Sequence, residues 1–232
     1  MRPKLFLTLV VPTVLALPAF AHDGDIGIRI NAGNRLETVL AGGEPPNQTF
    51  GADIERIFAA ELLFNATSSD VRLDEPGLAS EAAGLLNQPL GLNIRKALRR
   101  WNGSGFETTP LTLSVGGSDL GLPFSTTPLS DTLVTGPSIV VPEVPLDFHM
   151  DWVLNGASAS TGDGIYLLEI ELTSPGGPLL TSDPLWVVYN YNLSEEEHDA
   201  AIDYVAANYI PAAGTSALIL PAFALGARRR RR

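Results

Sequence analysis

The stretch Ile165-Tyr-Leu-Leu-Glu-Ile-Glu-Leu-Thr173 decides the fold class, because its second half alternates between apolar and polar side chains. Leu168 and the apolar residues at the next two alternate positions would lie on one face of a strand, with the glutamates on the other. A second run of β-forming residues, Leu185-Trp-Val-Val-Tyr-Asn190, follows the turn sequence Ser174-Pro-Gly-Gly-Pro178. The two runs predict strands that either pair as antiparallel neighbours or close one sheet each.

The rest of the body consists of short segments separated by turns, since Gly and Pro occur throughout it. Segments that alternate in the same way predict further strands, at residues 26–30, 35–40, 111–115 and 148–153. Residues 47–80 fit helical and strand spacing equally, and residues 92–101 fit a strand or a short helical turn. The whole pattern predicts a mainly β fold, an antiparallel β-sandwich of jelly-roll or Ig-like type.

One short helix is predicted near the end of the body. Ser194 followed by Glu197 fits a capping box, and two more glutamates add the negative charge favoured in a first turn. The apolar stripe of this helix would consist of Ala201, Ile202, Val205 and Tyr209. We therefore assign residues 22–193 to the β-sandwich domain and residues 194–209 to an amphipathic helix or linker.

The first residues are typical of a secretory signal peptide. Two basic residues occur among the first four, residues 5–17 are mostly apolar, and Ala19-Phe-Ala21 is a small-x-small cleavage sequence. We therefore assign residues 1–21 to an apolar targeting helix that signal peptidase removes. Cleavage between Ala21 and His22 would make His22 the mature N-terminus.

The body is strongly acidic once the two ends are set aside. Of 15 basic residues, two lie in the signal segment and five at the C-terminus, which leaves 8 against 26 acidic residues. Such a charge disfavours nucleic acid as a partner, because phosphates are bound by Lys and Arg. The chain contains no cysteine, which excludes disulfides, thiolate metal sites and cysteine catalysis.

The C-terminus combines an apolar run with a basic cluster. Residues 216–227 are apolar or small, too few to cross a hydrocarbon core of about 30 Å without the preceding residues. The cluster would stay on the cytoplasmic side by the positive-inside rule. It consists of Arg228, Arg229, Arg230, Arg231 and Arg232. These features predict a weak, transient or processed membrane anchor.

This C-terminal segment, residues 210–232, resembles the PEP-CTERM sorting signal of exported bacterial proteins. Pro211, Gly214 and Thr215 stand where that family commonly has Val-Pro-x-Pro-Gly-Thr, while Ala212 and Ala213 depart from its Glu and Pro. The body is similar to that of other exported proteins with such a tail. The resemblance implies export, transient retention in the inner membrane by an apolar C-terminal helix, and processing by an exosortase-like protease. The final location would be the cell surface, the outer envelope or the extracellular matrix.

Three histidines are the candidates for metal ligands. The free amine and imidazole of a mature N-terminal His22 could chelate one ion, and with His149 they would form a histidine brace. Asp151 would lie on the same strand face as His149 and add a carboxylate. Imidazole ligands suit copper or zinc. His198 lies beside acidic residues in the first helical turn, which indicates a solvated helix face.

No pattern for catalysis stands out in the chain. It contains no nucleophile elbow, phosphate loop or dinucleotide fingerprint, and Glu169 and Glu171 fit the outward face of a strand. A sugar-stacking platform could be built from Trp101, Trp152, Trp186, Tyr189 and Tyr191, although such aromatics also fit a core. The leading interpretation is a non-enzymatic exported surface or matrix protein. The alternatives are a copper- or zinc-binding protein and a carbohydrate-binding or carbohydrate-active module that contacts extracellular polysaccharide.

Overall fold

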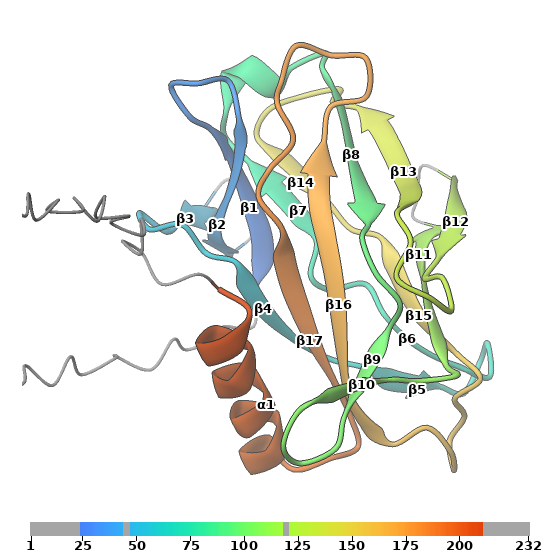
Figure 1. Ribbon diagram of the computed structural model, residues 1–232. Coiled ribbons are helices and arrows are strands. Elements are labelled where there is room, and N and C mark those ends of the chain that lie inside the picture. Colours follow the sequence, from blue (N-terminus) through green and yellow to red (C-terminus); the bar gives the residue numbers. More distant parts are fainter. Residues whose placement is uncertain (1–23, 44–46, 118–120, 211–232) are drawn as a thin grey trace, which may run out of the picture.

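The two strands expected between residues 165 and 190 lie at the centre of a seven-stranded sheet (Figure 1). The computed structural model describes residues 24–43, 47–117 and 121–210. Strands β16 and β17 pair as antiparallel neighbours, which confirms one of the two predicted alternatives. Five strands of the sheet lie in the order β10 (Phe106–Thr108), β9 (Arg99–Trp101), β16 (Gly164–Thr173), β17 (Leu185–Tyr191) and β4 (Ile57–Glu61). Strand β16 also pairs with β8 (Pro89–Ile94), and β8 pairs with β13 (Val134–Val140).

Two five-stranded sheets complete the β structure of the described residues. The first sheet has the order β14 (Leu146–Phe148), β7 (Leu78–Ser80), β1 (Asp25–Ile30), β2 (Leu36–Gly42) and β3 (Thr49–Phe50). The second has the order β12 (Leu122–Thr126), β11 (Thr112–Gly117), β15 (Asp151–Asn155), β6 (Asp70–Leu73) and β5 (Leu63–Asn65). The strands predicted at residues 26–30 and 35–40 form the antiparallel hairpin of β1 and β2, and the ambiguous residues 47–80 contain strands and no helix. A single 3₁₀ turn covers Ala83–Leu85.

The expectation of a purely antiparallel arrangement was wrong at two places. Strand β17 pairs in parallel with β4, and β1 pairs in parallel with β7. More than a hundred residues separate β4 from β17, so no tight turn forces their directions to alternate. Periodicity identifies a strand but contains no information about the direction of a distant neighbour. The mainly β class with one helix is confirmed.

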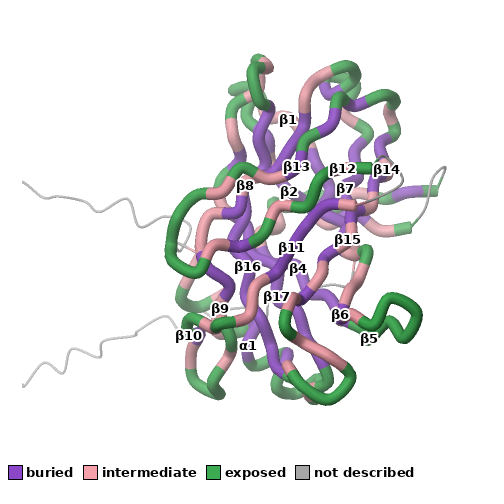
Figure 2. Tube along the Cα trace, turned by 90° about the vertical axis from the view of Figure 1, so that its right-hand side faces the viewer, coloured by how far each residue is buried: buried purple, intermediate pink, exposed green. Residues whose placement is uncertain are grey.

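One large core receives side chains from all three sheets. Leu168, Ile170 and Leu172 of β16 point into it, as their alternation predicted, together with Ile26 of β1 and Trp152 of β15. The buried residues follow the middle of the strands, whereas exposed residues lie mainly in the connecting loops (Figure 2).

Helix α1 (Glu195–Asn208) packs on one face of the seven-stranded sheet, over β4, β16 and β17 (Figure 1). Its Ala201, Ile202 and Val205 form a second core with residues of β4, β16 and β17. Strands β16 and β17 are therefore buried on both faces, which explains why the first half of β16 does not alternate. The predicted cap is confirmed, because Ser194 Oγ accepts a hydrogen bond from the Glu197 amide at 3.3 Å.

The predicted targeting segments, residues 1–21 and 210–232, lie outside the described residues except for Ile210. Among the residues that are described, no helix has both the length and the apolar character needed to cross a membrane.

Candidate metal centre

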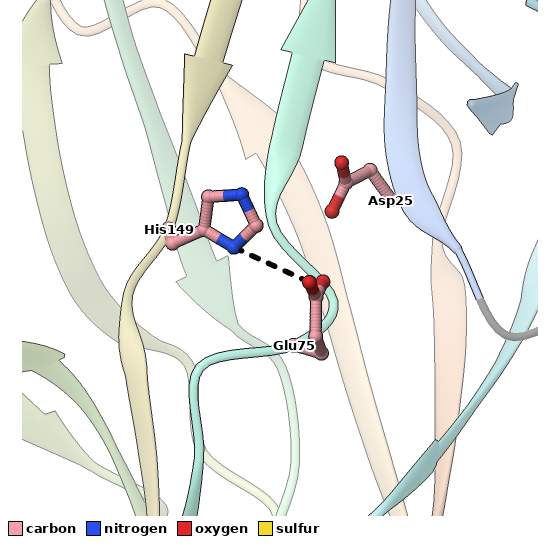
Figure 3. A group of neighbouring side chains, drawn as sticks. All are labelled: Asp25, Glu75 and His149. Carbon is pink, nitrogen blue, oxygen red and sulfur yellow. Dashed lines mark ion pairs between the residues drawn. The ribbon is translucent and has the colours of Figure 1, made fainter. Parts of the chain in front are cut away.

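Three ionisable side chains from separate segments meet at one end of the first five-stranded sheet. Asp25 is the first residue of β1, Glu75 lies in the turn before β7, and His149 directly follows β14. In the strand register, Leu78 of β7 pairs with both Ile26 and Phe148. This register places Asp25 and His149 on either side of the residue before Leu78. The three side chains point toward one another (Figure 3).

That preceding residue is Gly77, and only a glycine leaves room for the cluster. A Cβ at this position would lie 2.7 Å from Asp25 Oδ1 and 3.1 Å from His149 Nδ1. The Gly77 amide donates hydrogen bonds to Asp25 Oδ1 at 2.7 Å and to Glu75 Oε2 at 3.0 Å. One oxygen of each carboxyl group is therefore held in place by the backbone.

The imidazole of His149 is oriented by a fourth acidic residue. His149 Nε2 lies 3.2 Å from Asp147 Oδ1, and a carboxylate oxygen only accepts hydrogen bonds, so Nε2 donates a proton to it. The other nitrogen, Nδ1, also faces acceptors, since it lies 3.4 Å from Glu75 Oε1 and 3.3 Å from the Asp74 carbonyl oxygen. A metal ion at Nδ1 would therefore replace a proton there. A metal-bound histidine usually donates its other ring N–H to a carboxylate. The contact of His149 with Asp147 has this form.

Glu75 and His149 both hold a proton more tightly than usual. Burial, together with the hydrogen bond and charge of Asp25, raises the pKa of Glu75 to about 7. Burial lowers the pKa of His149, but the charges of Glu75, Asp25 and Asp147 outweigh it, so this pKa lies above its usual value. Two carboxyl groups this close repel each other when both are ionised. A divalent cation would relieve the repulsion as a shared proton does.

Solvent can reach the cluster from two depressions. His149, Asp74 and Asp147 line one of about 600 Å³, whose walls also include Leu146 and Met150. Asp25 and Glu75 line the other, of about 410 Å³, together with apolar residues such as Leu73. An ion could therefore enter without unfolding of the protein, and positions for solvent ligands would remain.

The predicted metal ligands are only partly brought together. His149 belongs to the cluster, whereas Asp151 turns toward Arg72, whose Nη1 lies 3.6 Å from Asp151 Oδ2. His149 and Asp151 do not share a continuous strand, because β14 ends at Phe148 and β15 begins at Asp151 in a different sheet. The alternate-residue rule therefore does not apply between them. His22 lies outside the described residues, as do Ala21, Pro211, Gly214, Thr215 and the five arginines.

Asp25 and Glu75 are the functional candidates that the sequence interpretation missed. Both occur in short acidic segments, Asp23-Gly-Asp25 and Asp74-Glu-Pro-Gly77, which are typical of turns. Their distance in the chain from His149 hides the contact. The one local sign of the site is Gly77, a glycine directly before an apolar strand. It indicates that other side chains approach the backbone closely, but only once those neighbours are known.

The proposed aromatic platform does not form. Trp152, Tyr189 and Tyr191 are fully buried in the core, and Trp186 is only 4% exposed. The exposed face that sugar stacking needs is therefore missing from these side chains. Trp101 packs against Phe106 and Tyr204, with ring centroids 5.1 and 5.2 Å apart.

Glu169 and Glu171 form a structural ion network under Arg95 and Lys96. Glu169 Oε1 lies 2.9 Å from Arg95 Nε, its Oε2 lies 2.9 Å from Lys96 Nζ, and Glu171 pairs with the same arginine. Both carboxylates are thus buried and neutralised on the face of β16 that points away from the large core, which agrees with the strand-face interpretation.

No known protein family matches the chain, and no curated protein matches it either.

Proposed function

We propose that this chain is an exported bacterial protein of the cell surface or extracellular matrix that binds a divalent transition metal at Asp25, Glu75 and His149. Export is supported by the signal-like residues 1–21 and the sorting-like residues 210–232, and the acidic body suits a soluble surface protein. Signal peptidase and an exosortase-like protease would process the two ends. The metal assignment rests on one observation, the meeting of three ligand atoms in front of Asp147.

The spacing of these atoms suits a metal ion. One ligand atom from each of Asp25, Glu75 and His149 lies within 4.8 Å of the other two. Ligands that bind a tetrahedral zinc ion at about 2.0 Å are about 3.3 Å apart. The separation of 3.4 Å between His149 Nδ1 and Glu75 Oε1 is already close to that value. Small side-chain rotations would therefore complete the coordination.

Zinc or copper fits the donor set better than calcium or magnesium. An imidazole nitrogen favours zinc and copper, whereas calcium and magnesium prefer oxygen ligands alone. His22 precedes Asp25 by only three residues in the sequence, and three residues span at most about 11 Å. The amine and imidazole that cleavage would expose at His22 are therefore candidates for further ligands.

Calorimetric titration of the full chain with zinc and with copper tests this proposal. Replacement of Glu75 by Gln keeps the side-chain shape and removes one ligand, so it should lower zinc affinity at least tenfold. Glu143→Gln is the matched control, because Glu143 lines the larger depression without belonging to the cluster. Equal affinity of Glu75→Gln and the parent chain for both metals would refute the site. A parallel His22→Ala titration of the chain cleaved after Ala21 measures whether the mature N-terminus contributes.

For the architecture we propose a two-layer β-sandwich, in which the seven-stranded sheet packs against the two five-stranded sheets. The single core with side chains from all three sheets supports this arrangement. The parallel pairs of β4 with β17 and of β1 with β7 would then be departures from a jelly-roll or Ig-like pattern.

A further inference from the structure

His198 does not lie on a solvated helix face, contrary to the expectation from its acidic neighbours. It is 2% exposed and is the first member of the buried stripe of α1, ahead of Ala201, Ile202 and Val205. An apolar side chain would be the ordinary choice at such a position. A buried imidazole here needs polar partners to offset the loss of water.

Both ring nitrogens of His198 face oxygen acceptors. Nε2 lies 3.0 Å from the carbonyl oxygen of Val188 in β17, and Nδ1 lies 3.0 Å from Glu61 Oε1 at the end of β4. A carbonyl oxygen only accepts hydrogen bonds, so Nε2 carries a proton. In the neutral imidazole, Nδ1 then directs a lone pair at a carboxylate. A proton or a metal cation must lie between these two atoms to make the contact favourable.

The same place gathers a second carboxylate. Glu195 opens α1, and one ligand atom from each of Glu61, Glu195 and His198 lies within 4.8 Å of the other two. The Nε2 bond to a backbone carbonyl is a common second-shell arrangement for a metal-bound histidine. Glu195 is exposed and the Glu61 side chain is 45% exposed, so the site is open to solvent on one side.

We propose that His198, Glu61 and Glu195 form a second site for a divalent transition cation such as zinc, which fastens α1 to the edge of the seven-stranded sheet. Two ligands come from the helix and one from β4, which lie side by side in Figure 1 and are in contact. The three glutamates of the first helical turn offset the positive potential that a helix N-terminus would otherwise present to a cation.

The consequence is a metal-dependent attachment of α1. This helix is the last described element before residues 211–232, which resemble a sorting signal. Its contacts with the sheet include apolar side chains and rings, such as Tyr204 against Trp101 of β9 at 5.2 Å. Bound zinc would add a crosslink at the N-terminal end of the helix, where apolar packing is weakest, and would suppress local opening there.

The test uses the full chain with Glu75→Gln, which weakens the first site at least tenfold and leaves this one intact. Zinc titration should still detect one equivalent, and zinc should slow amide hydrogen exchange in α1. Adding Glu195→Gln should weaken this binding at least about tenfold, because even second-shell changes cost 10–100-fold. Glu196→Gln is the matched control, with the same charge change in the same turn but outside the cluster.

The choice of Glu195 avoids the risk that a buried variant fails to fold, since this side chain is exposed. The proposal is overturned if the Glu75→Gln chain binds no zinc, or if zinc leaves exchange in α1 unchanged. Equal zinc affinities of the Glu195→Gln and Glu196→Gln chains would overturn it as well. Because the two sites share no residue, failure of this site leaves the Asp25 site standing, and the reverse also holds.

Discussion

Replacement of Asp147 by Asn should weaken zinc binding at the Asp25 site without removing a ligand. The Asp147 carboxylate lies 3.2 Å from His149 Nε2 and its side chain is 17% exposed, so the interaction is only partly screened. The substitution keeps the shape of the side chain and removes the charge that orients the imidazole and makes it more basic. Second-shell changes of this kind cost about 10–100-fold in affinity, or roughly 1.4–2.7 kcal/mol.

Asp151→Asn is the control for this experiment. It removes the same charge two residues beyond His149, yet Asp151 faces Arg72 and has no contact with the imidazole. Its zinc affinity should stay within about twofold of the parent. Both affinities would be measured by calorimetry, with unfolding curves in chelator to verify that each variant is folded. If Asp151→Asn lost as much affinity as Asp147→Asn, the reasoning from the His149–Asp147 contact would be refuted.

Three further outcomes concern Glu75, two tyrosines and Gly77. The pKa of Glu75 in the folded protein, about 7, exceeds its usual value of 4.5. The stability that protonated Glu75 contributes is therefore full below pH 4.5 and is lost as pH rises through 7. Urea unfolding in chelator should show this loss, and Glu75→Gln should abolish it. Tyr189 Oη is buried without a hydrogen-bond partner among the described residues, whereas Tyr191 donates to Ser158 at 2.8 Å. Tyr189→Phe should therefore raise the free energy of unfolding by about 1 kcal/mol and Tyr191→Phe should lower it by about 1 kcal/mol, and the opposite order in thermal or urea unfolding would contradict this. Gly77→Ala should cost about 1–3 kcal/mol of stability and at least tenfold in zinc affinity, because the new Cβ would displace the Asp25 carboxylate; an unchanged titration would exclude that role.

The local features of the fold could be predicted because they depend on neighbouring residues. Alternation in β16 identified which of its side chains enter the core, and Ser194 with Glu197 identified the start of α1. The parallel pairing of β4 with β17 could not be predicted in this way, because the two strands are far apart in the chain. Burial on both faces also erased the alternation at the start of β16.

The candidate site was predictable only in part, for the same reason. His149 could be singled out because histidine is rare in this chain, and its partner was sought two residues away. The chain changes sheets between Phe148 and Asp151, which sends Asp151 to Arg72 and leaves His149 beside Asp147. His198 was misjudged because its acidic neighbours in sequence indicated solvent, whereas the helix turns its imidazole toward β17.

The sequence by itself therefore determined the strands with clear alternation, the helix cap, the acidic charge and the absence of cysteine chemistry. These properties follow from residue types and short-range periods. Only the tertiary structure decided which carboxylates meet each histidine, because that depends on the register of β1, β7 and β14 and on the docking of α1. Such contacts join residues far apart in the chain. Gly77, which has no side chain, lies where Asp25 and Glu75 meet His149.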